Sequence, residues 1–380
     1  MRKMIIAMVG VFTVIALGLI CLMVVAVNRG GIWVTSGGFY DLKLVNEQTA
    51  PLDGVDQISI EYHADDVEFF TSDTNELILK EYMSFNPDED ELTRITQSGS
   101  RLKLKGRIYD NFNWLTHPTY GSRMEIYLPE DYQGAIDAST SSGDIDSSLV
   151  FTLSKLKLSA NSGDIMINEV TAAQIDLSTS SGNITVAKAE GARKFSANSG
   201  SIEVYEGAGD TSASTSSGNI VIESSSGLLE AEANSGNIVI RDSNGEKDLS
   251  TTSGNIEIED SVGYTRASAS SGRIGAENFT GAGRFKTNSG DLRLEFEDAP
   301  EAVTGDIIVN TSSGRVELTI PAALQFNFSA DTSSGSIDTF FDDKLSFSDR
   351  EHHAEGSVGT APNINLQVET TSGNIEVDQR

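Results

Sequence analysis

The chain has 380 residues, enough for one large domain or two ordinary ones, and a formal net charge of −29. Such a charge argues against DNA, RNA or an anionic lipid surface as a direct partner. The single cysteine excludes an intramolecular disulfide framework and a cysteine-rich metal site, and only four histidines occur.

The N-terminal region contains a predicted membrane anchor. Residues 4–27 form an uncharged apolar run that is long enough to span a bilayer as a helix. Arg2 and Lys3 precede it, so the positive-inside rule places residues 1–3 in the cytoplasm and the rest of the chain outside the cell. The alternative is a cleaved signal peptide and a secreted protein, but the length of the run favours the anchor. Cys21 is expected to be an ordinary apolar residue of this span.

Composition divides the remaining chain into three parts. We predict a linker at residues 28–54, an aromatic-rich β region at 55–135 that caps the repeats, and a Ser-Gly repeat domain at 136–380. Within 55–135, apolar and polar residues alternate in several short segments, as strands require. No stretch after residue 28 shows convincing helical periodicity, so the exported part is predicted to be all-β.

A short repeat dominates the third part. The repeat series consists of twelve copies of Ser-Gly followed by any residue and then an aliphatic one, and between Gly182 and Gly290 the interval is always 18 residues. A second set of glycines lies midway, beginning at Gly191. Glycine adopts positive φ without steric cost, so we expect a turn every nine residues. The predicted turn glycines are Gly143, Gly163, Gly182, Gly200, Gly218, Gly236, Gly254, Gly272, Gly290, Gly314, Gly335 and Gly373.

The residues around each of these glycines alternate between apolar and polar. This period-two pattern points one row inward and the other toward water, so each 18-residue unit supplies two short strands. An aliphatic residue always stands two positions after the glycine. These residues form the predicted core ladder: Ile145, Ile165, Ile184, Ile202, Ile220, Ile238, Ile256, Ile274, Leu292, Val316, Ile337 and Ile375.

Two topologies satisfy this alternation. In a two-sided β-solenoid (a β-helix or β-roll), each unit of about 18 residues is one coil whose two inner stripes meet. In an antiparallel β-meander rolled into a sandwich, each Ser-Gly is a hairpin turn. A meander would need another layer over its apolar face, and no such layer is visible in the sequence. A coil closes its own core and needs only neighbours and end caps, so we predict the solenoid.

The triplet before the glycine alternates between two forms. Asn161, Asn198, Asn234 and Asn288 interleave with Ser180, Ser216 and Thr252. We interpret this alternation as side-chain hydrogen bonding between stacked Asn and Ser or Thr residues along one edge, rather than as a ligand-binding row.

Three passages resemble a known family, the bacterial putative-adhesin β-strand-repeat proteins, also called toastrack domains. They are IEYHADDVEFF (60–70), RMEIYLPEDYQGAIDASTSSGDI (123–145), and VELTIPAALQFNFSADTSSGSI (316–337) with the final VETTSGNIEV. The resemblance covers about residues 55–380. With its N-terminal anchor, the chain is similar to the members associated with bacterial envelope-stress systems. The resemblance implies a solenoid-like fold at the cell surface and no established activity.

The residues offer little for catalysis or metal binding. The metal, phosphate-loop and nucleophile-elbow motifs of known enzymes are absent from the sequence, so no catalytic residue, cofactor or metal is predicted. Asp144 with Asp146, and Asp342 with Asp343, are the best carboxylate pairs, and we expect each on a solvated turn. The turns also lack the triple-glycine pattern of calcium-binding rolls.

The repeat is interrupted most between Gly335 and Gly373. The interruption includes a polar segment with His352-His353, which we expect to be exposed, and residues 341–359 are the predicted contact site because such insertions favour partners. The sequence thus predicts a non-enzymatic surface scaffold, adhesion or envelope-stress module, with a carbohydrate-active enzyme as the alternative. Its expected partners are the membrane, through residues 4–27, and an envelope protein or a cell-wall or surface glycan, without nucleic acid.

Overall fold

The structure is a computed structural model that describes residues 41–106, 121–348 and 352–380. These residues form strands β1 to β31 and three single-turn 3-10 helices, with no α-helix among them. No described helix is long and apolar enough to cross a bilayer. The predicted span at residues 4–27 lies outside the described residues. Residues 42–380 are one compact unit.

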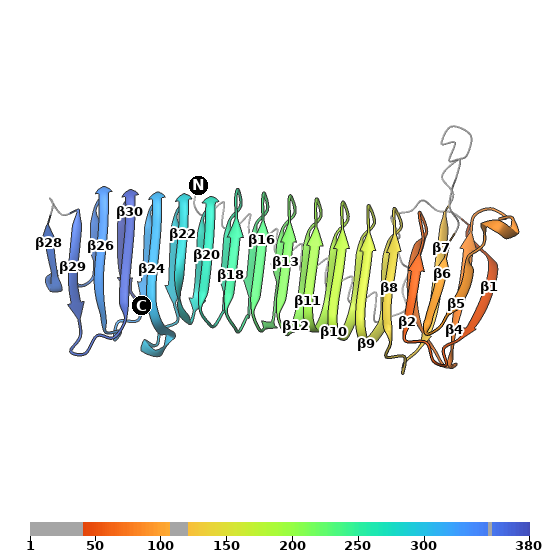
Figure 1. Cartoon of the computed structure of the whole chain (residues 1–380). Coiled ribbons are helices and arrows are strands. Elements are labelled where there is room, and N and C mark those ends of the chain that lie inside the picture. Colours follow the sequence, from red (N-terminus) through yellow and green to blue (C-terminus); the bar gives the residue numbers. More distant parts are fainter. Residues whose placement is uncertain (1–40, 107–120, 349–351) are drawn as a thin grey trace, which may run out of the picture. The chain divides into compact units, whose positions relative to one another are not determined.

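Two rows of strands run side by side along this unit (Figure 1). Row I consists, in spatial order, of β5 (Arg94–Ser98), β6 (Arg101–Lys105), β2 (Gln57–Glu61), β8 (Ala135–Thr140), the later halves of β9 (Ile145–Ala160), β10 (Ile165–Thr179) and β11 (Ile184–Ala197), then β13 (Thr211–Thr215), β16 (Leu229–Ala233), β18 (Lys247–Thr251), β20 (Thr265–Ser271), β22 (Gly281–Ser289), β24 (Val303–Ser313), β30 (Asn365–Ser372), β26 (Phe326–Ser334), β29 (His353–Val358) and β28 (Leu345–Ser348).

Row II consists of β1 (Lys43–Pro51), β4 (Glu76–Met83), β7 (Ser122–Pro129), β3 (Asp66–Ser72), the earlier halves of β9, β10 and β11, then β12 (Ile202–Ala208), β14 (Ile220–Ile222), β17 (Ile238–Arg241), β19 (Ile256–Glu259), β21 (Ile274–Phe279), β23 (Leu292–Phe296), β25 (Val316–Ile320), β31 (Ile375–Gln379) and β27 (Ile337–Thr339). The short β15 (Ser225–Ser226) pairs with the end of β12, and the 3-10 helices are η1 (Glu89–Glu91), η2 (Pro300–Ala302) and η3 (Asp342–Lys344).

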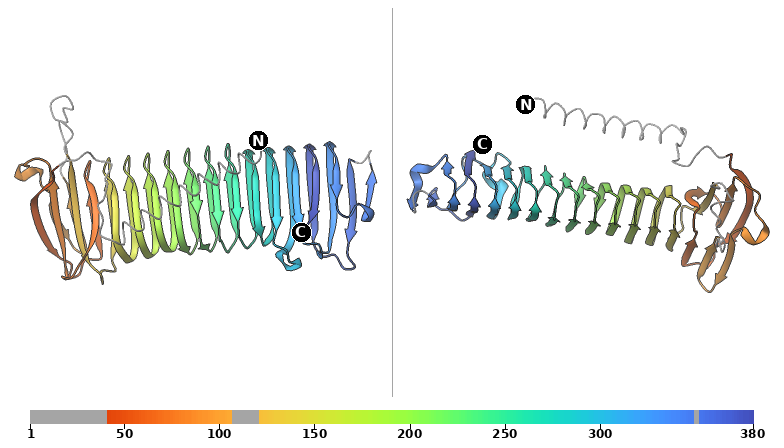
Figure 2. Two further views of the ribbon diagram at one scale, coloured as in Figure 1. Left: turned by 180° about the vertical axis from the view of Figure 1, so that it is seen from behind. Right: turned by 90° about the horizontal axis from the view of Figure 1, so that it is seen from above.

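The predicted solenoid is confirmed by the direction of pairing within the repeats. Strands one coil apart are parallel and in register, so that Ile202 pairs with Ile184 on one side and with Ile220 on the other. The antiparallel meander is therefore wrong for this region. The two rows face each other across a thin core (Figure 2), in which Ile184, Ile220 and Ile256 are fully buried. Each coil closes its own apolar seam and stacks on the next.

The Ser-Gly glycines form a continuous stack because neighbouring coils approach too closely there for any side chain. A Cβ atom on Gly218 would lie 1.9 Å from the carbonyl oxygen of Gly200, and one on Gly236 would lie 1.6 Å from that of Gly218. The expectation that these glycines are needed for positive φ is wrong. Among the described repeats, positive φ occurs instead at glycines of the second set, for example 123° at Gly191.

The alternating Thr and Ala three positions before each glycine have a clear structural reason. These side chains are buried, and in several Thr coils the hydroxyl group donates to a glycine of the neighbouring coil. Thr215 Oγ1 donates to the carbonyl oxygen of Gly200 at 2.9 Å and accepts from the backbone N–H of Gly218 at 3.1 Å. The same donation to a preceding glycine occurs at Thr251 and Thr287.

Replacing Thr215 with valine should lower the free energy of unfolding by about 1–2 kcal/mol. Valine preserves the shape but removes both hydrogen bonds and leaves the two backbone groups unsatisfied. Urea unfolding of the variant, beside Ser212→Ala on the outer face of the same strand, measures this. An equal and small effect for both variants would contradict the bridging role.

The polar ladder lies at a different position from the predicted one. No side-chain hydrogen bond joins Asn161, Asn198, Asn234 or Asn288 to a neighbouring coil in the described structure, and these residues are exposed. Instead, where the residue directly after Ser-Gly is Asn or Asp, its side chain accepts from the backbone of the neighbouring coil in several places. Asn219 Oδ1 accepts from Asn237 N at 2.9 Å, and Asn237 Oδ1 accepts from Asn255 N at 2.8 Å.

Both ends of the stack contain an inserted coil. At the C-terminal end, β30 and β31 lie between the coil β24–β25 and the coil β26–β27 (Figure 1). The chain therefore leaves one coil position empty after β25, forms β26 and β27 beyond it, and later returns to fill the empty position with β30 and β31. At the other end, β2 and β3 lie between β6–β7 and β8–β9. Antiparallel strands then cover each end: β1, β4 and β5 at one, and β28 and β29 at the other.

These ends differ from the predicted segment boundaries. Residues 43–51 of the predicted linker form β1, which pairs with β4 in the antiparallel direction. The region 55–135 does more than cap the repeats, because β2–β3 and β6–β7 within it are themselves coils of the solenoid.

Candidate functional site

The sequence-predicted pair Asp144 and Asp146 belongs to a larger group of carboxylates on the outer face of row II. Parallel pairing places Glu68 of β3 beside Asp146 of β9, and Glu125 of β7 beside Glu68. The carboxylate of Asp144 is not left to solvent on its turn, as was expected, because its Oδ1 accepts from Asp164 N at 2.8 Å. Sequence reasoning missed Glu68 and Glu125, since both lie outside the repeats.

Burial shifts the titration of this group. Desolvation, together with the charges of Asp144, Glu68, Asp66 and Asp164, raises the pKa of Asp146 to about 7. Its Oδ1 atom is buried without a hydrogen-bond partner.

The cation of this group is Arg123, which pairs with Glu125 and Glu68 and not with Asp146. Its guanidinium lies 2.9 Å from Glu125 and 3.8 Å from Glu68. A carboxylic acid that is half protonated near neutral pH can serve as a general acid, but only beside a bound substrate. The carboxylates lie on a pleated sheet face, and none of them lines the pocket described below. Their arrangement therefore gives no support to the enzyme alternative.

The second predicted pair has separate structural roles. Asp342 Oδ1 accepts from the N–H and hydroxyl groups of Thr339, at 3.1 and 2.7 Å, just before η3. Asp343 forms an exposed ion pair with Lys344 at 2.5 Å. Within residues 41–106, 121–348 and 352–380, no group of three or more His, Cys, Asp or Glu side chains is placed to hold a metal ion.

The described residues of the predicted contact segment 341–359 form an end cap. It contains η3, β28 and β29, and the two strands extend row I in the antiparallel direction. His353 Nδ1 lies 2.7 Å from Asp331, which raises the pKa of His353. Both histidines are half-buried rather than exposed as expected, because His353 pairs with β26 and the backbone carbonyl of His352 accepts from Thr332 N. Residues 349–351 lie outside the described structure.

Two cations lie within the solenoid core. Arg193 is 3% exposed and donates to the carbonyl oxygen of Gly209 at 2.7 Å, and Lys247 is 1% exposed and donates to that of Val262 at 2.8 Å. Burial lowers the pKa of Lys247 to about 8 and that of Arg193 to about 10. Both side chains donate to backbone carbonyl groups at the edge of the solenoid where the second set of glycines lies. We therefore assign them a structural role.

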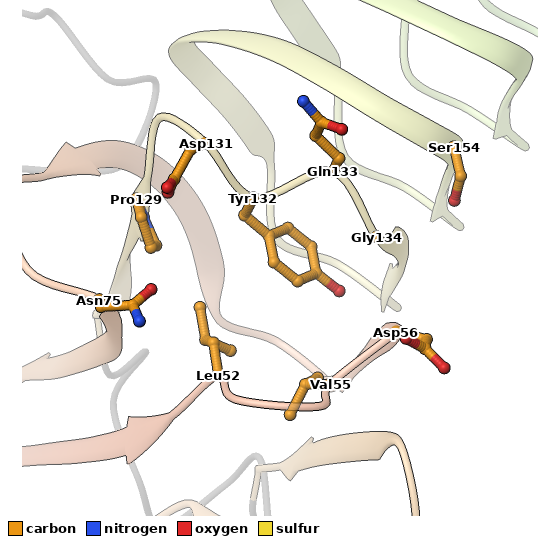
Figure 3. A pocket seen from close by; sticks show the side chains of 10 residues that line it. All are labelled: Leu52, Val55, Asp56, Asn75, Pro129, Asp131, Tyr132, Gln133, Gly134 and Ser154. Carbon is orange, nitrogen blue, oxygen red and sulfur yellow. The ribbon is translucent and has the colours of Figure 1, made fainter.

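A pocket of about 460 Å³ lies where the N-terminal strands meet the first repeat coils (Figure 3). Its walls come from the connection β1–β2, the turn between β3 and β4, the connection β7–β8 and the bend within β9 at Ser154. The inserted coil β2–β3 brings these segments together. Ala135 N donates to Asp56 O at 2.8 Å, and Ser154 N donates to Gln133 O at 2.9 Å, which fixes the walls.

The pocket combines an apolar floor with polar groups at its rim. Leu52, Val55 and Pro129 are buried, and the half-buried ring of Tyr132 lies beside Leu52 and Val55 in Figure 3. Burial and the nearby Asp56 carboxylate raise the pKa of Tyr132 above its usual range, so the phenol stays neutral. Sequence analysis missed this site, because the repeat pattern says nothing about which loops the inserted coil joins.

Comparison with protein families gave one assignment. A family model described as Toastrack DUF4097 matches residues 55–263 and again residues 210–378, and these two matches together span most of the chain. Comparison with curated proteins gave no match.

Three of the solved structures with similarity are bacterial proteins. A "putative cell adhesion protein" from Clostridium sporogenes ATCC 15579 is 10% identical, with 88% of this chain and 99% of that chain covered and a TM-score of 0.23. A "putative adhesin" from Bacteroides fragilis NCTC 9343 is 11% identical, with 90% and 100% covered and a TM-score of 0.24. A "putative lipid binding protein" from Parabacteroides distasonis ATCC 8503 is 12% identical, with 87% and 96% covered and a TM-score of 0.24. Scores this low carry no argument, so the assignment depends on the family match.

Proposed function

The chain belongs to the Toastrack DUF4097 family, and we propose that it acts without catalysis, as a rigid interaction module displayed outside the cell on a single membrane span. One observation carries the proposal. Every coil from Gly182 to Gly290 is joined to both neighbours by parallel strand pairing and by the glycine stack. A stack in which each coil contacts only its neighbours is suited to holding binding surfaces at fixed positions.

The charge and the apolar N-terminal run support display in an aqueous exterior. A net charge of −29 keeps such a module soluble and repels nucleic acid and anionic lipid headgroups. The run at residues 4–27 is long enough to anchor it, and Arg2 and Lys3 favour a cytoplasmic N-terminus. Adhesion or envelope-stress signalling would each use such a displayed module.

Protease treatment of intact cells tests this proposal. The full chain carries one epitope tag before Arg2 and another after Arg380. We expect the C-terminal tag to be lost from intact cells and the N-terminal tag to be retained with the membrane fraction. A cytoplasmic protein serves as the control for cell integrity. Survival of both tags until the cells are lysed would contradict the topology, and release of the C-terminal tag into the medium would indicate a secreted protein.

A partner can be captured in the same cells. Crosslinking of intact cells followed by recovery of the C-terminal tag should retain an envelope component that is absent when the crosslinker is added after detergent lysis.

A further inference from the structure

The pocket of Figure 3 has the size and the lining of a small-ligand site. Its volume of about 460 Å³ falls in the range of about 300–1,000 Å³ that is usual for such sites. The lining pairs a small apolar surface with several polar side chains, which is the combination that fixes both the affinity and the orientation of a ligand.

The apolar part suits the C–H face of a sugar ring. Tyr132 Oη donates to the carbonyl oxygen of Ala135 at 3.4 Å, which holds the ring beside Leu52 and Val55. The face of an aromatic ring carries partial negative charge and attracts polarised C–H groups. A pyranose presents such groups on one face and hydroxyl groups around its edge.

The polar part consists mainly of hydrogen-bond acceptors. Asp56 and Asp131 contribute carboxylates, and Asn75 donates through Nδ2 to Asp53 at 3.4 Å, which leaves its carbonyl oxygen as an acceptor. Gln133 adds a second amide. Hydroxyl groups are the donors that such a rim would satisfy.

Charge and spacing narrow the class of ligand. None of the residues that line the pocket is Lys, Arg or His, so a sugar acid, sulfate or phosphate would meet only negative charge. Figure 3 shows Asp56 and Asp131 on opposite sides of Tyr132. Carboxylates that are spread in this way suit several separate hydroxyl groups better than a single cation.

We propose that this pocket binds one neutral sugar residue of a surface glycan, stacked on Tyr132, with its hydroxyl groups donating to Asp56 and Asp131. The assignment deepens the proposed surface function by naming the ligand class. Binding to the purified protein does not depend on membrane topology, so a failure here is distinguishable from a failure of the protease experiment.

The test uses the full chain in detergent micelles and saturation-transfer NMR with four probes: galactose, N-acetylglucosamine, glucuronic acid and glucosamine. We expect saturable binding of at least one neutral sugar, with a Kd on the order of 1 mM, and binding of glucuronic acid at least about tenfold weaker. Tyr132→Leu, which keeps the apolar bulk, should abolish the signal.

Two variants at the exposed rim keep the test valid if the Tyr132 variant misfolds. Asp131→Asn and Gln133→Ala should each weaken binding about tenfold with an unchanged Tm, since each removes one hydrogen-bond acceptor. Asp338→Asn on β27, which makes the same charge change outside the pocket, should bind like the wild type. The proposal is overturned if no neutral sugar binds saturably, or if glucosamine is the only probe that binds. It is also overturned if glucuronic acid binds as tightly as the neutral sugar, or if Asp338→Asn weakens binding as much as Asp131→Asn does.

Discussion

Replacing Gly218 with alanine should lower the free energy of unfolding by about 3–5 kcal/mol, because the new methyl group has no space between two coils. Its Cβ would lie 1.9 Å from the carbonyl oxygen and 2.4 Å from the carbonyl carbon of Gly200. Relief would require the coils to separate, and separation would stretch the Thr215 bridge at the same place. The φ angle of Gly218 is not in the left-handed region, so this cost is steric rather than conformational.

The same solenoid contains a matched control. A Cβ atom on Gly275, in β21, would meet nothing within 4 Å, and its φ angle is also outside the left-handed region. We therefore expect Gly275→Ala to be neutral or to stabilise the protein by about 0.5–1 kcal/mol, since alanine restricts the unfolded chain more than glycine does.

Urea unfolding and amide hydrogen exchange can separate the two glycine variants. In a stack of coils the damage should be greatest at the altered coil, so exchange in β13 and β14 should accelerate in Gly218→Ala and not in Gly275→Ala. Similar unfolding free energies for the two variants would show that the coils tolerate a side chain at the stack, and the steric account would be wrong.

The repeats could be predicted from the sequence because their physics is local and periodic. Alternation at Ile220 and its equivalents fixes which side chains face inward, and the 18-residue interval fixes which residues become neighbours once the coils stack. The topology followed from the lack of any second layer to cover the apolar face. The reason for the Ser-Gly glycines did not follow, because close approach between coils depends on three-dimensional packing.

The polar ladder was misplaced for a related reason. The alternation at Asn161 and Asn198 is conspicuous in the sequence, but it follows the buried Thr and Ala that stand one position before. The actual ladder residues, such as Asn219 and Asn237, follow the glycine directly. A recurrent Asn or Asp at that position was the available signal, because these side chains readily accept from nearby backbone N–H groups.

The ends and the pocket could not be obtained from periodicity. Nothing in the sequence of β30 indicates that it returns to lie between β24 and β26. The same holds for the coil β2–β3, which brings Leu52 and Tyr132 into one pocket. All coils share the same alternation of apolar and polar residues, so alternation cannot tell which coil a distant segment pairs with. That pairing depends on which position in the stack is vacant.

The half-buried carboxyl group of Asp146, which lies outside the pocket, gives the second large effect. We expect Asp146→Asn to stabilise the protein by about 4 kcal/mol near pH 8 and to have little effect near pH 4. Asp146 of β9 is close to Asp144 just before its own strand, to Glu68 and Asp66 on β3, and to Asp164 just before β10, and no cation offsets their charges. Asparagine keeps the size, cannot ionise, and can donate a hydrogen bond to these carboxylates.

The sign of the pH dependence follows from the direction of the shift. The pKa of Asp146 is about 7 in the folded protein and 3.8 in an unperturbed chain. Below the lower value both states are protonated, so the group contributes nothing. Between the two values the unfolded chain ionises while the folded protein keeps its proton. The wild type therefore loses stability as the pH rises, and above the folded pKa the loss is complete.

Urea unfolding of the wild type and the Asp146→Asn variant between about pH 4 and pH 8 measures this difference. Asp248→Asn on β18, an exposed carboxylate of row I, controls for the change in net charge. The gap in unfolding free energy between Asp146→Asn and the wild type should open across the interval between the two pKa values, because only there do the two states of the wild type differ in protonation. A gap that is constant with pH, or one that Asp248→Asn reproduces, would mean that burial beside Glu68 and Asp144 does not hold the proton on Asp146.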